Sequence, residues 1–114
     1  MHTVNLKNEI VGMVSNAPRW DVVAYKGVAS LYEVIVENTN LNPLLQVTII
    51  LYATDTRQVL LFNWFPEIVN DTTFRWSITP SDLADFKPVI YAVTAIDQDA
   101  NLLFFGSFEL IGGL

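Results

Sequence analysis

Apolar and polar residues alternate along several short segments of this chain, and a period of two is typical of β-strands with one buried face. In residues 45–54 the odd positions are apolar, namely Leu45, Val47, Ile49, Leu51 and Ala53. Residues 73–78 and residues 89–95 repeat the pattern with aromatic and β-branched side chains, which suit a pleated sheet. We therefore expect three half-buried strands here, with Trp76 on the core face of the second one.

Turn-forming residues separate these segments at strand-like intervals of ~8–12 residues. Lys26-Gly27 predicts one turn, an asparagine- and proline-rich stretch over residues 38–43 predicts another, and residues 97–101 predict a third. Only a short turn of helix is indicated after residue 79, and no segment has the long helical pattern of a parallel crossover. We therefore predict an all-β fold, a single antiparallel two-sheet β-sandwich of about seven strands with an apolar N-terminal arm.

The pattern in the C-terminal part of the chain is similar to that of a known superfamily. Residues 91–97, a polar turn and residues 101–110 resemble the last hairpin of immunoglobulin-like and fibronectin type III-like sandwiches. Tyr91 takes the place of their F-strand tyrosine, and residues 28–38 resemble their second strand. The likeness covers residues 21–111 as an order of strands, without the Cys…Trp…Cys arrangement of immunoglobulins. It implies a two-sheet sandwich but no activity, because such sandwiches host many unrelated functions.

Residues 1–18 precede the first expected strand of the sandwich and are too apolar for a disordered tail. We therefore divide the chain into an N-terminal arm, residues 1–18, and a β-sandwich domain, residues 19–114. Leu6 and its neighbours alternate as in a strand, whereas Leu6, Ile10 and Val14 share one face of a helix, so both structures stay open. The arm docks either on its own sandwich or on a neighbouring copy, and we favour the neighbour.

The composition predicts an unusually apolar surface for a soluble domain. The chain has 114 residues, the size of one domain, with 52% hydrophobic and 16% charged residues. Ordinary soluble domains carry ~25% charged residues. The net charge of −6 opposes binding to nucleic acid, and no apolar run reaches the ~18 residues of a membrane span. We therefore expect no nucleic-acid partner and no membrane insertion.

Few residues of this chain could carry catalysis or hold a metal ion. It has no cysteine, which excludes thiolate nucleophiles and zinc–thiolate sites, and its one histidine is His2 near the terminus. Asp97, Asp99 and Asn101 could offer oxygen ligands to calcium, but the glycine and distal glutamate of an EF-hand loop are missing, and a β-turn selects the same residue types. We therefore expect no enzyme and no catalytic residue, cofactor or metal.

Residues 58–65 are apolar on both faces of the strand that they predict. The two faces carry Val59, Leu61 and Phe65 on one side and Leu60, Phe62 and Trp64 on the other. A sandwich strand has a single core face, so the second set needs a cover. The arm or residues 66–69 could supply it, and so could a ligand or another subunit. Outward-facing Ile50 and Tyr52 of the preceding strand would extend the same surface.

Together these features predict a non-enzymatic, self-associating structural subunit, such as a homo-oligomer, a filament or sheath protomer, or a capsid or tail accessory protein. The expected contact residues are Leu60, Phe62 and Trp64 on the sandwich and Leu6, Ile10 and Val14 on the arm. The alternative is a carbohydrate- or ligand-binding, adhesin-like module in which an exposed aromatic residue such as Trp20 contacts a sugar or another small molecule. Core packing is the other interpretation of Trp20.

Overall fold

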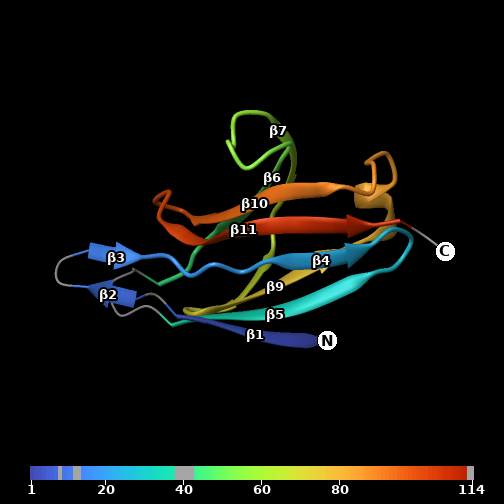
Figure 1. Cartoon of the computed structure of the whole chain (residues 1–114). Helices are drawn as coiled ribbons and strands as arrows, with labels where there is room; N and C mark the ends of the chain where they lie inside the picture. The colour runs from blue at the N-terminus through green and yellow to red at the C-terminus, as the bar shows by residue number, and fades with distance from the viewer. Residues whose placement is uncertain (8, 12–13, 38–42, 113–114) are drawn as a thin grey trace.

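The alternating segments form β-strands, and the computed structural model of the chain holds one short 3₁₀ helix but no α-helix in the part that it describes. The structure describes the backbone of residues 1–7, 9–11, 14–37 and 43–112, and the side chains of the same residues apart from 9–11 and 14–16. Two main sheets face each other, with β5 and β9 in the lower one and β10 and β11 in the upper one (Figure 1). The prediction of an all-β fold with two sheets is therefore confirmed.

The lower sheet has four strands in the order β1-β5-β9-β8. Their bounds are β1 (His2–Lys7), β5 (Ser30–Glu37), β8 (Glu67–Asn70) and β9 (Thr73–Ile78). Strand β9 pairs antiparallel with both β5 and β8, whereas β1 runs parallel to β5. The inner face of β9 carries Phe74, Trp76 and Ile78, all buried as their alternation predicts.

The upper sheet has five strands in the order β4-β11-β10-β6-β7. Their bounds are β4 (Val22–Tyr25), β6 (Val47–Tyr52), β7 (Leu60–Trp64), β10 (Ile90–Asp97) and β11 (Leu102–Ile111). The 3₁₀ helix η1 (Pro80–Leu83) lies between β9 and β10 along the chain. Strand β4 is parallel to β11, and the other neighbours are antiparallel.

Two parts of the fold prediction are wrong: the two main sheets hold nine described strands instead of about seven, and their pairing is mixed instead of antiparallel. Both parallel pairs, β1 with β5 and β4 with β11, place an N-terminal strand at a sheet edge. Parallel partners need a long intervening connection, and local alternation carries no information about it. A further antiparallel pair, β2 (Glu9–Val11) with β3 (Val14–Asn16), lies beyond the left end of both sheets in Figure 1.

The core between the sheets is built around the three tryptophans of the chain. The ring centroid of fully buried Trp76 lies 5.3 Å from that of Trp64 and 5.8 Å from that of Trp20. Phe104 and Phe108 of β11 complete this aromatic cluster from the upper sheet. Edge-to-face pairs of this kind add ~0.5–1.5 kcal/mol each beyond the area that they bury, so the cluster fixes how the two sheets face each other.

Candidate interaction face

The solvent-facing side of the lower sheet is polar. Residues that are partners in register project from the same side of a sheet. Lys7 is the partner of Glu37 on this side, and Arg75 lies between its partners Glu33 and Glu67. Charged side chains of both signs thus lie across the solvent-facing side of this sheet and keep it in contact with water. Its large apolar members include Leu31 and Ile35, and Val69 at the bulge of edge strand β8 is also exposed.

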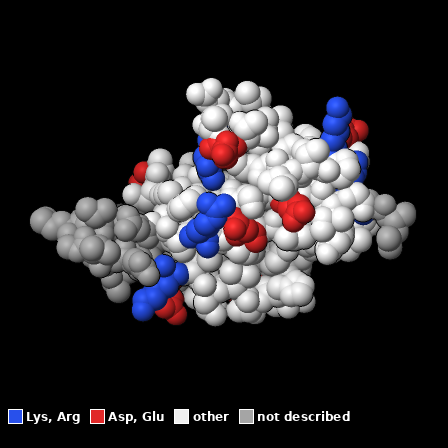
Figure 2. Space-filling view, viewed as in Figure 1, with Lys and Arg blue, Asp and Glu red and all other residues white. Residues whose placement is uncertain are grey.

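The solvent-facing side of the upper sheet is apolar, and we call it the apolar face. Its large or apolar side chains are Val23 and Tyr25 of β4, Phe105 and Ile111 of β11, Ile90, Ala92 and Ile96 of β10, Ile50 and Tyr52 of β6, and Leu60 of β7. Among the strand residues that the structure describes there, Glu109 alone is charged. In the view of Figure 2 charged groups are small and separate, with blue and red atoms adjacent in most of them.

The loop of residues 53–59 crosses the apolar face and places Arg57 on its middle. The backbone of Arg57 has a φ of 54°, in the left-handed region that non-glycine residues seldom adopt. Its Nε donates to Oγ1 of Thr94 at 2.9 Å, one Nη donates to the carbonyl of Asp55 at 2.9 Å, and the other donates to the carbonyl of Gly106 at 3.3 Å. This guanidinium group covers Thr94, which is buried although it points outward.

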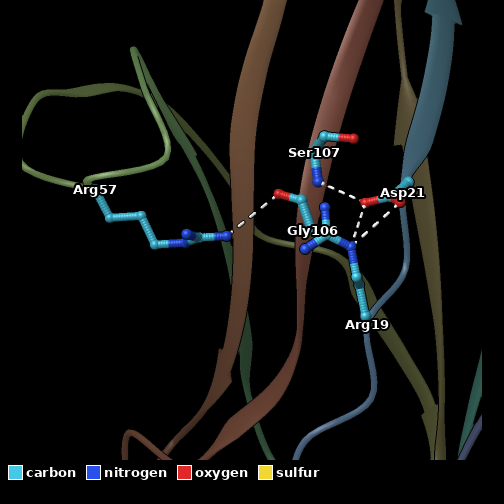
Figure 3. Close-up of polar contacts among 5 residues, drawn as sticks. All are labelled: Arg19, Asp21, Arg57, Gly106 and Ser107. Atoms are coloured by element: carbon cyan, nitrogen blue, oxygen red, sulfur yellow. Dashed lines mark hydrogen bonds and ion pairs between the residues drawn. The ribbon is translucent and has the colours of Figure 1, made fainter.

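A second arginine approaches β11 from the opposite side (Figure 3). Arg19 pairs with Asp21 at 3.0 Å between Nε and Oδ1, and the same Oδ1 accepts the N–H of Ser107 at 2.9 Å. The hydrogen bond from the Ser107 N–H, and to a smaller extent that from Arg19, holds the pKa of Asp21 below its ordinary value of 3.8. Asp21 therefore stays ionised near neutral pH and fixes the direction in which Arg19 extends.

The two guanidinium groups flank one aromatic ring. The Cζ atoms of Arg19 and Arg57 lie 5.9 and 5.8 Å from the ring centroid of Phe105, within the range of a cation–π contact. A hollow of about 510 Å³ opens between them, and we call it the arginine hollow. Its other lining residues include apolar Ile90 and polar Thr54 and Ser107, so polar and apolar surface lie together under the two cationic groups.

A second hollow, of about 770 Å³, lies at one end of the apolar face. Tyr25 and Ile111, which belong to that face, line it together with exposed Val28 and Pro88. Lys26 lies beside them, and its Nζ donates to the carbonyl of Phe86 at 2.7 Å. The apolar face therefore continues beyond the ends of its strands into a concave, mostly apolar surface.

The structure separates the three contact residues that the sequence predicts on β7. Leu60 is the partner of Tyr52 and is 53% exposed on the apolar face, whereas Phe62 is the partner of Leu51 on the core side. Trp64 also points inward and is only 6% exposed. The expectation of one shared outward face is therefore wrong, because Leu61 is an extra residue in the pairing and such a bulge reverses the alternation.

The arm residues have one described outcome. Leu6 is a partner of Val36 in register and is 4% exposed, within the core cluster of its own chain. The helical alternative for residues 1–18 is wrong for this part, because residues 2–7 form β1. Ile10 and Val14 lie on the backbone of β2 and β3, and their side chains lie outside the described residues.

Trp20 is half-buried, and its ring packs into the core cluster. The ring centroid of Tyr32 lies 5.2 Å away, that of Phe104 5.0 Å away and that of Trp76 5.8 Å away. A sugar-binding tryptophan presents a free ring face to its ligand, and three ring contacts leave Trp20 little of that surface. The core interpretation therefore describes this residue better than the ligand-contact interpretation.

The candidate calcium ligands form a turn. Oδ1 of Asp97 accepts the backbone N–H groups of Asp99 and Asn101, each at 2.9 Å, and its Oδ2 accepts Nδ2 of Asn101 at 3.1 Å. Ala100 takes the left-handed conformation that closes the turn. Within the described residues, no three His, Cys, Asp or Glu side chains gather as metal ligands do, and no helix has the length and hydrophobicity to cross a membrane.

Sequence reasoning did not identify most residues of the apolar face. Ile50, Tyr52 and Leu60 were expected to face outward, but Ile90, Phe105 and Arg57 were not singled out. One signal was present for the first of these, because β10 carries apolar residues at even as well as odd positions, as residues 58–65 do. In comparisons with known proteins, no family model and no curated sequence matches this chain, so the chain's own geometry carries the functional argument.

Proposed function

We propose that this protein is a non-enzymatic structural subunit that associates with further copies of itself through the apolar face. The observation that carries the proposal is the contrast between the two sheets. Register partners of opposite charge lie on the outer side of the lower sheet, whereas the outer side of the upper sheet has Glu109 as its one charged strand residue among those described. Arg57 lies on the middle of this face, and the apolar surface around it is of a kind that is uncommon on monomers and marks an interaction site.

The size of the apolar face suits a second copy of the chain. The five strands hold four to ten residues each, so at a spacing of ~4.8 Å and a rise of ~3.3 Å they cover roughly 500 Å². Together with the hollow beside Tyr25 and Ile111, the face approaches the ~800 Å² per partner of a standard protein interface. Face-to-face contact between two such sheets would also remove exposed Ile90, Tyr25 and Leu60 from water, at ~25 cal/mol for each Å² of apolar surface.

We also infer an immunoglobulin-like arrangement of the sandwich. In that fold strands B, E and D share one sheet and strands G, F and C share the other. The orders β5-β9-β8 and β11-β10-β6 correspond to these when the strands are matched along the chain. Further support comes from Tyr91, whose hydroxyl donates to the carbonyl of Lys87 at 2.7 Å, as the F-strand tyrosine of such domains does with backbone a few residues upstream.

Two lysine variants with matched exposure test self-association. Val23 on the apolar face is 41% exposed and Leu31 on the lower sheet is 40% exposed, so each side chain meets solvent equally in the single chain. The side chain introduced by Val23→Lys would also lie beside Glu109, the register partner of Val23. This opposite charge favours the lysine in the folded chain. Light scattering coupled to size-exclusion chromatography at micromolar concentration measures the mass of each protein.

We expect the wild type and Leu31→Lys to have a mass of two or more chains, and Val23→Lys to shift toward the 12.8 kDa of one chain. A wild-type mass of one chain would overturn the proposal and leave the binding module as the alternative. Equal effects of the two variants would show that association does not depend on the apolar face.

A further inference from the structure

We propose that the arginine hollow binds a small organic carboxylate with an apolar or aromatic body. This site lies on the apolar face and shares Ile90 and Phe105 with the proposed contact between copies, but it differs from that contact because it requires guanidinium groups.

The hollow is less acidic than the chain as a whole. Its charged lining residues are Arg19, Arg57 and Asp55, and Asp21 pairs with Arg19 beside them, so the local charges balance, whereas the whole protein carries −6. Two of the chain's three arginines therefore lie at one hollow of an acidic protein, and the third, Arg75, lies on the lower sheet. Within the described residues Arg57 donates to one hydroxyl and two carbonyls and to no carboxylate, and a planar guanidinium group suits the carboxylate of a ligand.

Arg57 is held in place before any ligand arrives. Its bonds to Thr94, Asp55 and Gly106 use three of the five N–H donors of a guanidinium group, so within the described residues two donors remain for a ligand. Arg19 is likewise directed by Asp21, which is itself held by the Ser107 N–H. Donors that are already ordered lose little conformational entropy on binding, so their hydrogen bonds contribute more fully to affinity.

The floor of the hollow defines the rest of the ligand. Phe105 and Ile90 line it with aromatic and aliphatic surface beside polar Thr54 and Ser107, and its volume of about 510 Å³ falls within the ~300–1,000 Å³ of small-molecule sites. A ring or a short aliphatic chain could lie against Phe105 while its carboxylate reaches the arginines. A strongly hydrophilic anion such as inorganic phosphate would leave Phe105 and Ile90 uncovered.

Titration with benzoate tests the site, with benzyl alcohol and benzylammonium as neutral and cationic probes of similar shape. The Val23→Lys variant is the suitable background, because Val23 does not line the hollow and its substitution weakens the proposed contact between copies. Amide NMR resonances of Gly106 and Ser107 report on the site. We expect benzoate to shift them saturably in the millimolar range, and the other two probes to leave them unchanged.

Two arginine variants show whether the site is specific. Arg19→Gln removes one charge from the hollow and should weaken benzoate binding about tenfold. Arg75→Gln removes the same charge from the lower sheet and should leave binding unchanged. Binding of benzylammonium as tight as that of benzoate, equal losses in the two variants, or no saturable shift with benzoate would each overturn the proposal. None of these outcomes changes the mass measurements, so failure of this site is distinguishable from failure of self-association.

Discussion

The indole Nε1 of Trp64 donates a hydrogen bond of 3.1 Å to Oδ2 of Asp82, which joins the last residue of β7 to the short helix η1. The same Oδ2 accepts the backbone N–H of Thr79 at 2.8 Å, at the start of that helix. One carboxylate oxygen thus satisfies a nearly buried indole and a helix N-terminus together. Trp64 is therefore tied to its own chain by a polar contact as well as by aromatic packing.

Removing this carboxylate should destabilise the fold without changing its state of association. Asp82→Ala leaves the N–H groups of Trp64 and Thr79 without their acceptor, and we expect the free energy of unfolding to fall by ~1–3 kcal/mol. Asp85→Ala removes an exposed carboxylate nearby and should change it by less than ~0.5 kcal/mol. Chemical denaturation followed by tryptophan fluorescence measures both. Equal stability of the two variants would show that the Trp64 contact contributes nothing.

Truncation of Trp64 itself should act on the fold and not on assembly. Trp64→Ser empties a core site between Trp76 and Phe108, where loss of a large aromatic costs ~3–5 kcal/mol. Thermal unfolding and light scattering on the same sample separate the two roles. A protein of wild-type stability but smaller mass would return Trp64 to the contact surface that the sequence predicts.

Period-two alternation predicted which side chains are buried in the strands that pair regularly with their neighbours. It failed where one extra residue interrupts the pairing. Residues 73–78 are the clearest success, with buried Phe74, Trp76 and Ile78. On β7 the extra residue Leu61 turns Phe62 and Trp64 inward, and no local pattern marks a bulge of this kind. At the start of β6 the alternation extends too far, since Leu45 lies outside the strand and is exposed.

The parts of the candidate face that escaped sequence analysis depend on long-range contacts. Arg57 reaches Thr94 and Gly106 from a loop far away in sequence, and Arg19 reaches the Phe105 ring across an isolated parallel bridge. The sequence shows that the chain contains arginines. Only the pairing of β6 with β10 and of β4 with β11 brings Arg19 and Arg57 to the ring of Phe105. The composition indicated that the surface is apolar, but it could not indicate which sheet carries the apolar side.

Gly106 should be intolerant of any side chain. Hydrogen bonds from Trp20 N to Phe105 O at 2.9 Å and from Phe105 N to Pro18 O at 3.3 Å bring residues 18–20 against β11. A Cβ on Gly106 would overlap the carbonyl of Trp20, with its carbon 2.6 Å away. We expect Gly106→Ala to cost ~1–3 kcal/mol, as overpacking does. Gly112→Ala is the control, because its Cβ would meet Pro88 at an ordinary 3.6 Å, and an equal loss there would contradict this view of Gly106.

The pair of Asp21 with Arg19 and Ser107 predicts a small acid-dependent contribution to stability. The pKa of Asp21 is lowered from 3.8 in the folded chain, so its contribution is complete above 3.8 and is lost as the pH falls through the folded value. Asp21→Asn should therefore have a lower free energy of unfolding than the wild type near neutral pH. We expect the difference to be under ~1 kcal/mol, because the side chains of Asp21 and Arg19 are both about half exposed. Unfolding curves from about pH 2 to pH 7 should converge at the acid end. A difference that persists unchanged at the lowest pH would assign the effect to something other than ionisation.

In the proposed assembly, the place of strand β1 would decide how copies of the chain are connected. It pairs with β5 of the same chain over six residues, and Leu6 projects into the core beside Val34 and Val36. Leu6→Ala should therefore cost ~2–5 kcal/mol wherever the strand comes from, since the same pocket is left partly empty. This variant alone cannot distinguish a strand of the same chain from an identical strand of a neighbour, the arrangement that the sequence favours.

Deletion of residues 1–18 in the Val23→Lys background makes the distinction, because the contact through the apolar face is already weakened there. With β1 docked on its own chain, Val23→Lys alone should have the mass of one chain, and the deletion should expose β5 and the core beneath Leu6. The shortened protein should then unfold at lower temperature and aggregate without a defined species.

With β1 exchanged between copies, Val23→Lys should keep a defined mass of two or more chains and a concentration-dependent melting temperature. The deletion should in that case give a folded β domain of smaller mass, and circular dichroism with light scattering on both proteins would detect it. We expect the first outcome, because the parallel pairing with β5 buries Leu6 without any contribution from a second chain.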